Sequence, residues 1–262
     1  MSNELVRYEC HRPAVVLTMN RPERRNALSR DLIAALTAAF QRARADVGSC
    51  VILTGAGNAF CAGMDLAELQ ESLTAGEGKQ NPVWDDALRL ANLYDLIYRF
   101  PKPTIAAVNG AAVAGGAGLV TVCDLSVAAL DARFGYPEVR RGLVAAMVMP
   151  HLLRHVGERL ARHLLLTGEL IDAEEAYRAG FINAVAPAEQ VLARALAWAH
   201  SLAEGGPNAL AKTKELLHLF SRQAVGLEEA AKASAAPRLT EECRQGLEAF
   251  FSKRPAPWAP GY

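Results

Sequence analysis

The chain has 262 residues, of which 51% are hydrophobic, and it carries 28 basic and 28 acidic side chains. A hydrophobic fraction this high argues against a disordered chain, and the length allows a large core. The formal net charge of zero gives no overall attraction to nucleic acid or to an anionic membrane, so we expect neither as a partner.

The first half of the chain alternates short apolar runs with helical patterns. Ser29 can cap a helix whose apolar positions repeat at helical spacing up to Phe40. Pro101 and Pro103 stop a later helix. Strands are predicted at 14–19, 50–54 and 104–108, helices after Ser29, at 65–73 and at 85–100, and a polar loop at 77–82.

The second half continues this alternation and then becomes helical. An Asn109-Gly110 turn is predicted to lead into a helix near Gly115. Residues 147–180 are predicted to be helical, with Gly180 ending the last helix. The remaining predicted strands are 125–130 and 182–185, and the remaining predicted helices are 188–203, 207–222, 225–235 and 239–252.

Short apolar strands without polar alternation, separated by helices, are typical of a parallel sheet covered by helices. The sequence therefore predicts an α/β fold. The uncharged stretch 103–123 is long enough to cross a bilayer, but it contains Asn109 and several glycines. We interpret it as buried strand, turn and helix, and expect no membrane association.

The five cysteines are scattered and form no CxxC pair. This pattern predicts neither a metal site nor a redox motif. Reduced cysteines and an N-terminus without an apolar signal core favour a cytoplasmic protein. Residues 55–60 (GAGNAF) begin like a dinucleotide fingerprint, but Phe60 occupies the third glycine position, so nucleotide binding of that kind is not expected.

Two glycine-rich segments follow successive strands: residues 60–65 (FCAGMD), here called the first corner, and residues 109–118 (NGAAVAGGAG), the second corner. Each can turn a strand into a helix and leave backbone N–H groups free at the helix start. Two such groups facing one point would form an oxyanion hole that stabilises an enolate. Small residues also occur at tight corners for packing alone, and spacing does not separate these interpretations.

Glu138 follows Tyr136-Pro137, which favours an extended backbone before it. A carboxylate aimed into an apolar pocket would have a raised pKa and would suit proton transfer. A solvated Glu138 paired with Arg140 or Arg141 is the alternative that the residues leave open.

Together these segments resemble the enoyl-CoA hydratase/isomerase (crotonase) superfamily. The resemblance rests on FCAGMDL, PTIAAVNGAAVAGGAGL, CDL, FGYPEVRRGL and TGELIDAEEAYRAGFINAV, and on NRPERRNALS as the opening coenzyme A segment. It covers about residues 5–190 in register. It implies a crotonase-like ββα spiral core with the acyl-CoA site over 1–190, and a C-terminal helical oligomerisation region over 191–262 that forms a homotrimer or homohexamer.

The resemblance also implies an acyl-CoA thioester substrate, with coenzyme A as part of the substrate and no separate cofactor. By position, Glu138 is the catalytic residue, and Met64 and Gly115 supply the oxyanion-hole amides. The implied substrate and coenzyme A contacts are Arg24, Arg25, Ala27, Ala62, Asp65, Leu66, Gly118 and Pro137. For Arg24 a solvated loop charge is the alternative.

One departure from the family pattern bears on the reaction. The best-known hydratases use two glutamates, and the position of one of them is Gly118 here, which we expect to leave room for water or a bulkier acyl group. Adding water needs a proton at one carbon and activated water at the next, whereas moving a double bond needs one base. The sequence favours isomerisation through Glu138. Hydration is the alternative, and a non-catalytic coenzyme A-binding or assembly protein is a second.

A second departure is the segment 143–157, where the family usually has a glycine-rich stretch. Met147 and Met149 are predicted to make the acyl pocket apolar and adaptable. His151 and Asp65 are candidate replacements for the missing acid. We expect His151 to pack or cap a helix instead, and Asp65 to support the coenzyme A corner.

Overall fold

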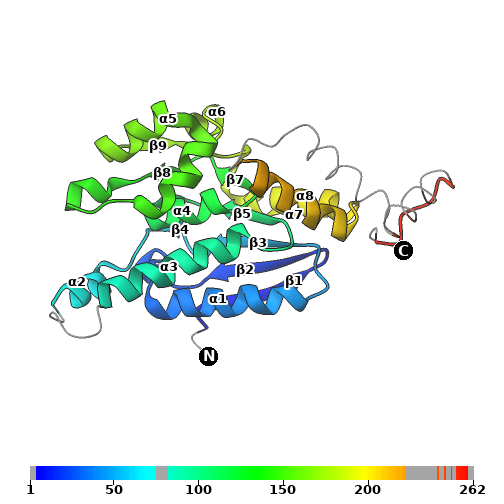
Figure 1. Cartoon of the computed structure of the whole chain (residues 1–262), viewed down its shortest axis with the longest axis horizontal. Coiled ribbons are helices and arrows are strands. Elements are labelled where there is room, and N and C mark those ends of the chain that lie inside the picture. Colours follow the sequence, from blue (N-terminus) through cyan, green and yellow to red (C-terminus); the bar gives the residue numbers. More distant parts are fainter. Residues whose placement is uncertain are drawn as a thin grey trace.

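The computed structural model describes residues 4–74, 82–221 and 252–258, together with residues 241, 245 and 249. The helix predicted at 225–235, nearly all of the one at 239–252 and all but the last residue of the loop predicted at 77–82 lie outside these residues. The described chain forms two β-sheets with helices packed around them (Figure 1).

The larger sheet has the strand order β1-β2-β3-β5-β7-β10. Its strands are β1 (Val6–His11), β2 (Ala14–Met19), β3 (Cys50–Gly55), β5 (Thr104–Val108), β7 (Leu125–Ala129) and β10 (Ala184–Ala186). β1 is antiparallel to β2, and all other pairs are parallel. The five predicted strands are confirmed. β1 was not predicted, because this edge strand exposes most of its side chains and so lacks an apolar run.

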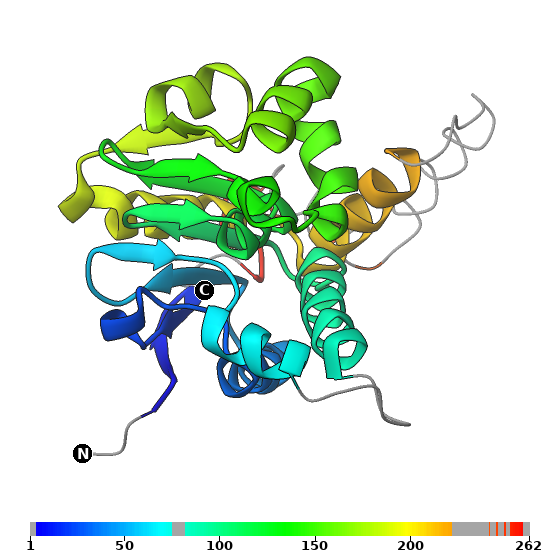
Figure 2. The same cartoon turned by 90° about the vertical axis from the view of Figure 1, so that its left-hand side faces the viewer.

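The smaller sheet has the order β4-β6-β8-β9. Its strands are β4 (Ala59–Cys61), β6 (Ala111–Val113), β8 (Arg133–Gly135) and β9 (Leu170–Asp172). Three residues are too few to show a periodic pattern, which is why none of these strands was predicted. The order β4, β6, β8 repeats the order β3, β5, β7, so each turn of the chain lays one strand in each sheet. This is the expected ββα spiral, and Figure 2 shows its turns stacked on one another.

The helices match the predicted positions, except that β9 interrupts the stretch 147–180 that was predicted to be helical. They are α1 (Arg30–Ala45), α2 (Leu66–Thr74), α3 (Pro82–Tyr98), α4 (Gly115–Val122), α5 (Met149–Thr167), α6 (Ala173–Arg178), α7 (Val191–Ala203) and α8 (Pro207–Phe220). The Ser29 hydroxyl accepts a hydrogen bond from the Leu32 N–H and caps α1 as predicted. Gly180, with a φ of 77°, ends the α6 region.

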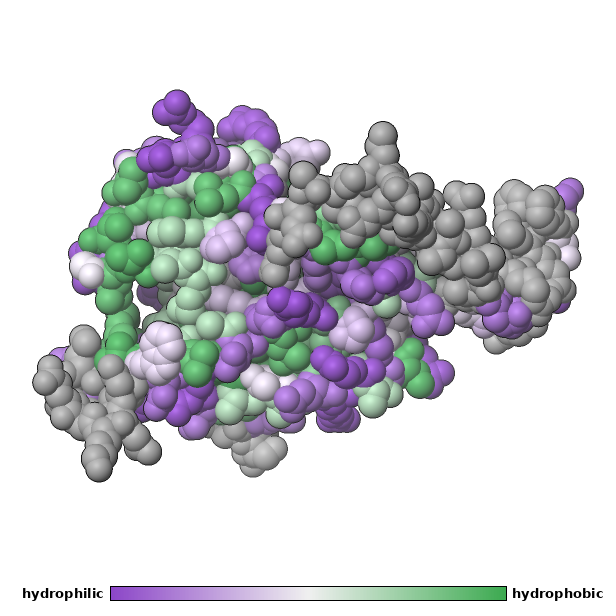
Figure 3. Space-filling view, viewed as in Figure 1, coloured by the Kyte–Doolittle hydropathy of each residue, from purple (hydrophilic) through white to green (hydrophobic). Residues whose placement is uncertain are grey.

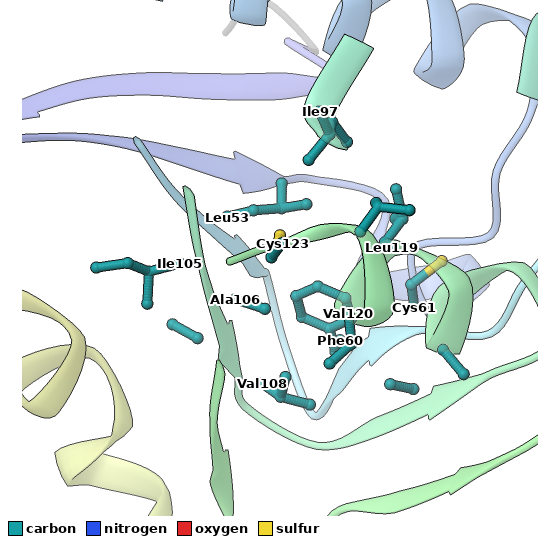
Figure 4. Close-up of a cluster of buried hydrophobic side chains, with 14 of the residues drawn as sticks. Leu53, Phe60, Cys61, Ile97, Ile105, Ala106, Val108, Leu119, Val120 and Cys123 are labelled. Atoms are coloured by element: carbon teal, nitrogen blue, oxygen red, sulfur yellow. The ribbon is translucent and has the colours of Figure 1, made fainter. Parts of the chain in front are cut away.

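The uncharged stretch forms the centre of the molecule. Every residue of α4 is buried. Its Leu119 and Val120 pack with Leu53 of β3 and Ile105 of β5 in the cluster of Figure 4. Burying such side chains is the main source of stability here, at about 1.5–3 kcal/mol for each large one. Among the described residues we find no helix that combines the length and the apolar character needed to cross a membrane.

The packing of α7 bears on the region predicted to follow residue 190. Ala195 and Ala199 of α7 are completely buried, and the helix packs against β3, β5 and β7. Small side chains on this face let the helix approach the sheet closely. α7 is therefore part of the core, although it lies in the region predicted to be separate. Oligomerisation through the region 191–262 stays a prediction.

Candidate active site

The two corners lie side by side because β4 and β6 are adjacent parallel strands whose carboxyl ends point the same way. Gly63 in the first corner has a φ of 92°, and Ala114 in the second has a φ of 53° and a ψ of −124°. A Cβ added to Gly63 would come within 2.8 Å of the Ala114 Cβ and 3.2 Å of the Gly115 nitrogen. Only glycine at position 63 allows this close approach.

The backbone N–H groups of Met64 and Gly115 are not used by the bridge and the helix to which these residues belong. Met64 pairs with Leu28 in an isolated parallel bridge in which Leu28 uses both of its own backbone groups, toward Gly63 and Asp65. The Met64 N–H therefore takes no part in that bridge. Gly115 is the first residue of α4, and an N–H at that position has no acceptor within its own helix.

Met64 and Gly115 both line a cavity of about 360 Å³. Apolar side chains from the segment before α5 form another part of its wall, among them Val144 and Met147. On the face shown in Figure 3, apolar side chains gather between α5 and α2. Met147 thus lies where it was predicted, whereas Met149 does not line the cavity.

Glu138 faces the same cavity from a 3₁₀ turn over Pro137–Arg141, directly after β8. Its carboxyl is half-buried, and within the described part of the chain its buried Oε2 has no hydrogen-bond partner. Burial raises the pKa of this carboxyl, and its own backbone N–H and Arg141 offset only part of the effect. Arg140 and Arg141 donate instead to the carbonyls of Thr167 and Pro137, so the paired and solvated alternative is not what the structure shows.

Gly118 does not lie where the sequence suggested. It is buried in α4 and does not line the cavity. A Cβ on Gly118 would overlap the hydroxyl of Tyr94 and lie 2.7 Å from both Tyr94 Cζ and Val148 Cγ1. The expectation that Gly118 leaves room for water or a larger acyl group is therefore wrong, because Tyr94 and Val148 already fill that space.

The remaining predicted contacts divide into two groups. Ala62, Leu66 and Pro137 line the cavity, which agrees with a place near the substrate. Arg24, Arg25, Ala27 and Asp65 do not line it.

The segment that contains Arg24 and Arg25 nevertheless lies against the first corner. The Ala62 N–H donates to the Arg25 carbonyl over 3.0 Å. The side chains of Arg24 and Arg25 are exposed, so they are free to reach an anion outside the cavity. Contact of Arg24 and Arg25 with coenzyme A stays a prediction.

Asp65 stabilises the first corner through hydrogen bonds, the structural role that the sequence predicted for it. One carboxylate oxygen accepts from Arg21 at 3.1 Å, and the other accepts from the Ala67 N–H at 3.1 Å. Arg21 also donates to the Ala27 carbonyl over 2.7 Å and so ties the two segments together. His151 packs its ring against Tyr98, with centroids 4.5 Å apart, and does not line the cavity.

Sequence reasoning missed the part of the wall that α3 contributes. Asp86 is buried and binds Arg30 over 2.8 Å, and Tyr94 donates from its hydroxyl to the Gly115 carbonyl over 2.7 Å. Both residues line the cavity. No motif marks them, because α3 reaches the corners only through packing. The thiols of Cys50, Cys61 and Cys123 are buried with pKa values of about 12, which leaves them protonated and unreactive.

Comparison with known proteins agrees with this spiral and its corner cavity. The sequence model of "Enoyl-CoA hydratase/isomerase" matches residues 11–260. A solved enoyl-CoA hydratase/isomerase from Marinobacter aquaeolei superposes with a TM-score of 0.89 at 34% identity, over 97% of this chain and 99% of that one. The fold is therefore that of the crotonase-type acyl-CoA enzymes. The chain belongs to the enoyl-CoA hydratase/isomerase family.

Curated relatives cover nearly the whole chain. A protein of Thermus thermophilus named "Putative enoyl-CoA hydratase" is 46% identical over 92% of this chain and 95% of its own length. The 2,3-dehydroadipyl-CoA hydratase of Escherichia coli is 36% identical over 92% of both chains. These relatives carry the name of a hydratase, and neither is named an isomerase.

Proposed function

We propose that this chain moves a proton on the acyl group of an enoyl-CoA thioester, with Glu138 as the single base. The amides of Met64 and Gly115 hold the thioester oxygen in this proposal. The observation that carries it is the buried Oε2 of Glu138, which has no hydrogen-bond partner among the described residues and belongs to a side chain in the same cavity as the two corners. A raised pKa also makes this carboxylate a stronger base toward a C–H group.

The proposed reaction shifts a double bond from the 3 to the 2 position. The ionised Glu138 accepts a proton from C2 of a 3-enoyl-CoA, and the electron pair of the broken C–H bond delocalises onto the thioester oxygen. The resulting dienolate oxygen accepts hydrogen bonds from the Met64 and Gly115 amides. Protonated Glu138 then returns its proton to C4, which leaves the conjugated 2-enoyl-CoA and the enzyme unchanged.

The packing around Gly118 favours this single-base reaction over hydration. The space above Gly118 is filled by Tyr94 and Val148, so no second carboxylate can extend from that position. Asp86 also lines the cavity, but it is bound by Arg30 and Arg89. Its charge is compensated, which makes it a poor second base.

Hydration of a 2-enoyl-CoA is the second candidate, because the relatives are named hydratases. In that reaction Glu138 alone would have to serve both the attacking water and the carbon that is protonated. The two candidates differ in their products, so they can be separated directly.

The test follows the absorbance of the conjugated enoyl thioester with purified protein. Isomerisation produces this absorbance from a 3-enoyl-CoA, and hydration removes it from a 2-enoyl-CoA. We expect the first to be faster and Glu138→Gln to lower it by about 10²–10⁴-fold. Glu158→Gln is the matched control, since Glu158 is an exposed residue of α5 paired with Arg162.

Each other result has a definite meaning. A Glu138→Gln variant with unchanged turnover would exclude Glu138 as the base. Faster hydration than isomerisation, lost in Glu138→Gln, would replace the isomerase proposal by the hydratase one.

A further inference from the structure

Tyr94 connects α3 to the start of α4. Its side chain is 2% exposed and lines the cavity beside Glu138. Its hydroxyl donates a hydrogen bond of 2.7 Å to the carbonyl of Gly115. The contact is close, because a Cβ on Gly115 would lie 3.3 Å from the same hydroxyl.

The backbone that Tyr94 holds is the glycine-rich start of α4. Gly115 and Gly116 carry no side chain, so their peptide groups rotate more freely than those of other residues. Ala114 before them has a φ of 53° and a ψ of −124°, a conformation that L-residues seldom adopt. A bond to the Gly115 carbonyl therefore limits rotation at a residue that lines the cavity.

The hydroxyl of Tyr94 is suited to this structural bond and not to proton transfer. Burial raises its pKa well above the usual value, and Cys61, Tyr136 and Glu138 add to the effect. The phenol stays protonated, and its hydrogen is already donated to Gly115. What it supplies is a fixed hydrogen bond next to the reacting groups.

We propose that Tyr94 is a positioning residue for the oxyanion hole, and that its bond to the Gly115 carbonyl aims the Gly115 N–H at the same point as the Met64 N–H. The inference rests on the proposed function, which gives those two amides their role. Loss of a complete oxyanion donor costs about 10²–10³-fold in kcat. Loss of its alignment costs less, and we expect about a tenfold decrease.

The test uses Tyr94→Phe, which removes the hydroxyl and keeps the ring. We expect kcat to fall about tenfold with little change in KM, because the bond acts on the developing charge and not on coenzyme A. Tyr98→Phe is the matched control. It lies one turn further along α3 and does not line this cavity, so its kcat should stay at the wild-type value.

A second measurement needs no turnover. A saturated acyl-CoA bound to the protein should show a lowered thioester C=O stretching frequency in infrared difference spectra, since the amides polarise the carbonyl. In Tyr94→Phe this frequency should return part of the way to that of free acyl-CoA. A merely structural role for Tyr94 would lower the melting temperature and leave the frequency unchanged.

The proposal is overturned if Tyr94→Phe keeps both the wild-type kcat and the wild-type carbonyl frequency, or if it changes stability alone. Glu138→Gln separates this result from the proposed function. That variant should lose turnover and keep the carbonyl shift. If it stayed active, the single-base proposal would fail, and the frequency in Tyr94→Phe would still decide the role of Tyr94.

Discussion

The hydroxyl of Tyr94 occupies the place that a Cβ on Gly118 would take, so even a methyl group on Gly118 would overlap it. The two residues come from α3 and α4, which pack against each other. The missing carboxylate at position 118 is therefore not an open place in the site. The absence of a side chain at Gly118 of α4 makes room for the ring of Tyr94 of α3.

Gly118→Ala should destabilise the protein. Overpacking a buried site costs about 1–3 kcal/mol, which exceeds the roughly 1 kcal/mol that alanine gains over glycine in a helix. The double variant Gly118→Ala/Tyr94→Phe should recover only part of the loss, because Tyr94 Cζ and Val148 Cγ1 remain 2.7 Å from the added carbon. Urea unfolding measures both. A stability of Gly118→Ala equal to the wild type would show that α3 moves away at no cost.

The difference in stability between the Glu138→Gln variant and the wild type should depend on pH. Burial raises the pKa of Glu138, so its contribution to stability is full below the ordinary carboxyl range and is lost as the pH rises through the raised value. Glutamine does not ionise and avoids this loss. The variant should melt higher than the wild type at neutral pH, and the difference should vanish in acid. Thermal unfolding across this pH range tests the sign, and a difference independent of pH would contradict it.

Activity should rise with pH over the range in which Glu138 ionises. The base must be ionised, so kcat/KM should rise with pH through the raised pKa of Glu138. A pH–rate profile of the wild type measures this. A profile that falls over the same interval would mean that the protonated carboxyl is the reactive form.

Asp65→Ala should weaken substrate binding more than it slows chemistry. The ion pair with Arg21 joins the first corner to the segment that carries Arg24 and Arg25, and Asp65 itself does not line the cavity. We expect a loss of about 1–3 kcal/mol in unfolding free energy and a higher KM. Asp65→Asn, which keeps an oxygen acceptor, should change less. A large loss of kcat at constant KM would instead identify Asp65 as a catalytic acid.

Lys214→Met should lower the free energy of unfolding, because Lys214 joins α8 to Asp124. Lys214 is buried, and its Nζ lies 2.6 Å from Asp124, which also accepts from the Thr104 N–H over 2.7 Å. Breaking a buried pair costs about 3–5 kcal/mol, and the lower end applies because Asp124 is partly exposed. Lys212→Met on the same helix removes an exposed pair with Glu215 and should cost less than about 1 kcal/mol. Equal losses in denaturant titrations would contradict this.

The longer elements of the fold were predictable from local patterns. Apolar runs such as 104–108 and the spacing behind the Ser29 cap identify strands and helices without reference to the rest of the chain. β4, β6, β8 and β9 were not predictable, because a three-residue strand becomes a strand only by pairing with its neighbours. The packing of α7 against β3, β5 and β7 was not predictable for a related reason. The small residues of α7 do not indicate which strands the helix packs against, because the sheet forms only in the tertiary structure.

The sequence by itself determined the alternation of strand and helix, the two glycine corners and the presence of a single glutamate at position 138, because each depends on residues close together in the chain. Only the tertiary structure decided what surrounds them. It brought Tyr94 onto Gly118 and Gly115, bound Asp65 to Arg21, and left Oε2 of Glu138 buried among the described residues without a partner. These contacts join segments that are distant in sequence. The contact of Tyr94 with the start of α4, which shapes the cavity, forms only when α3 packs against α4.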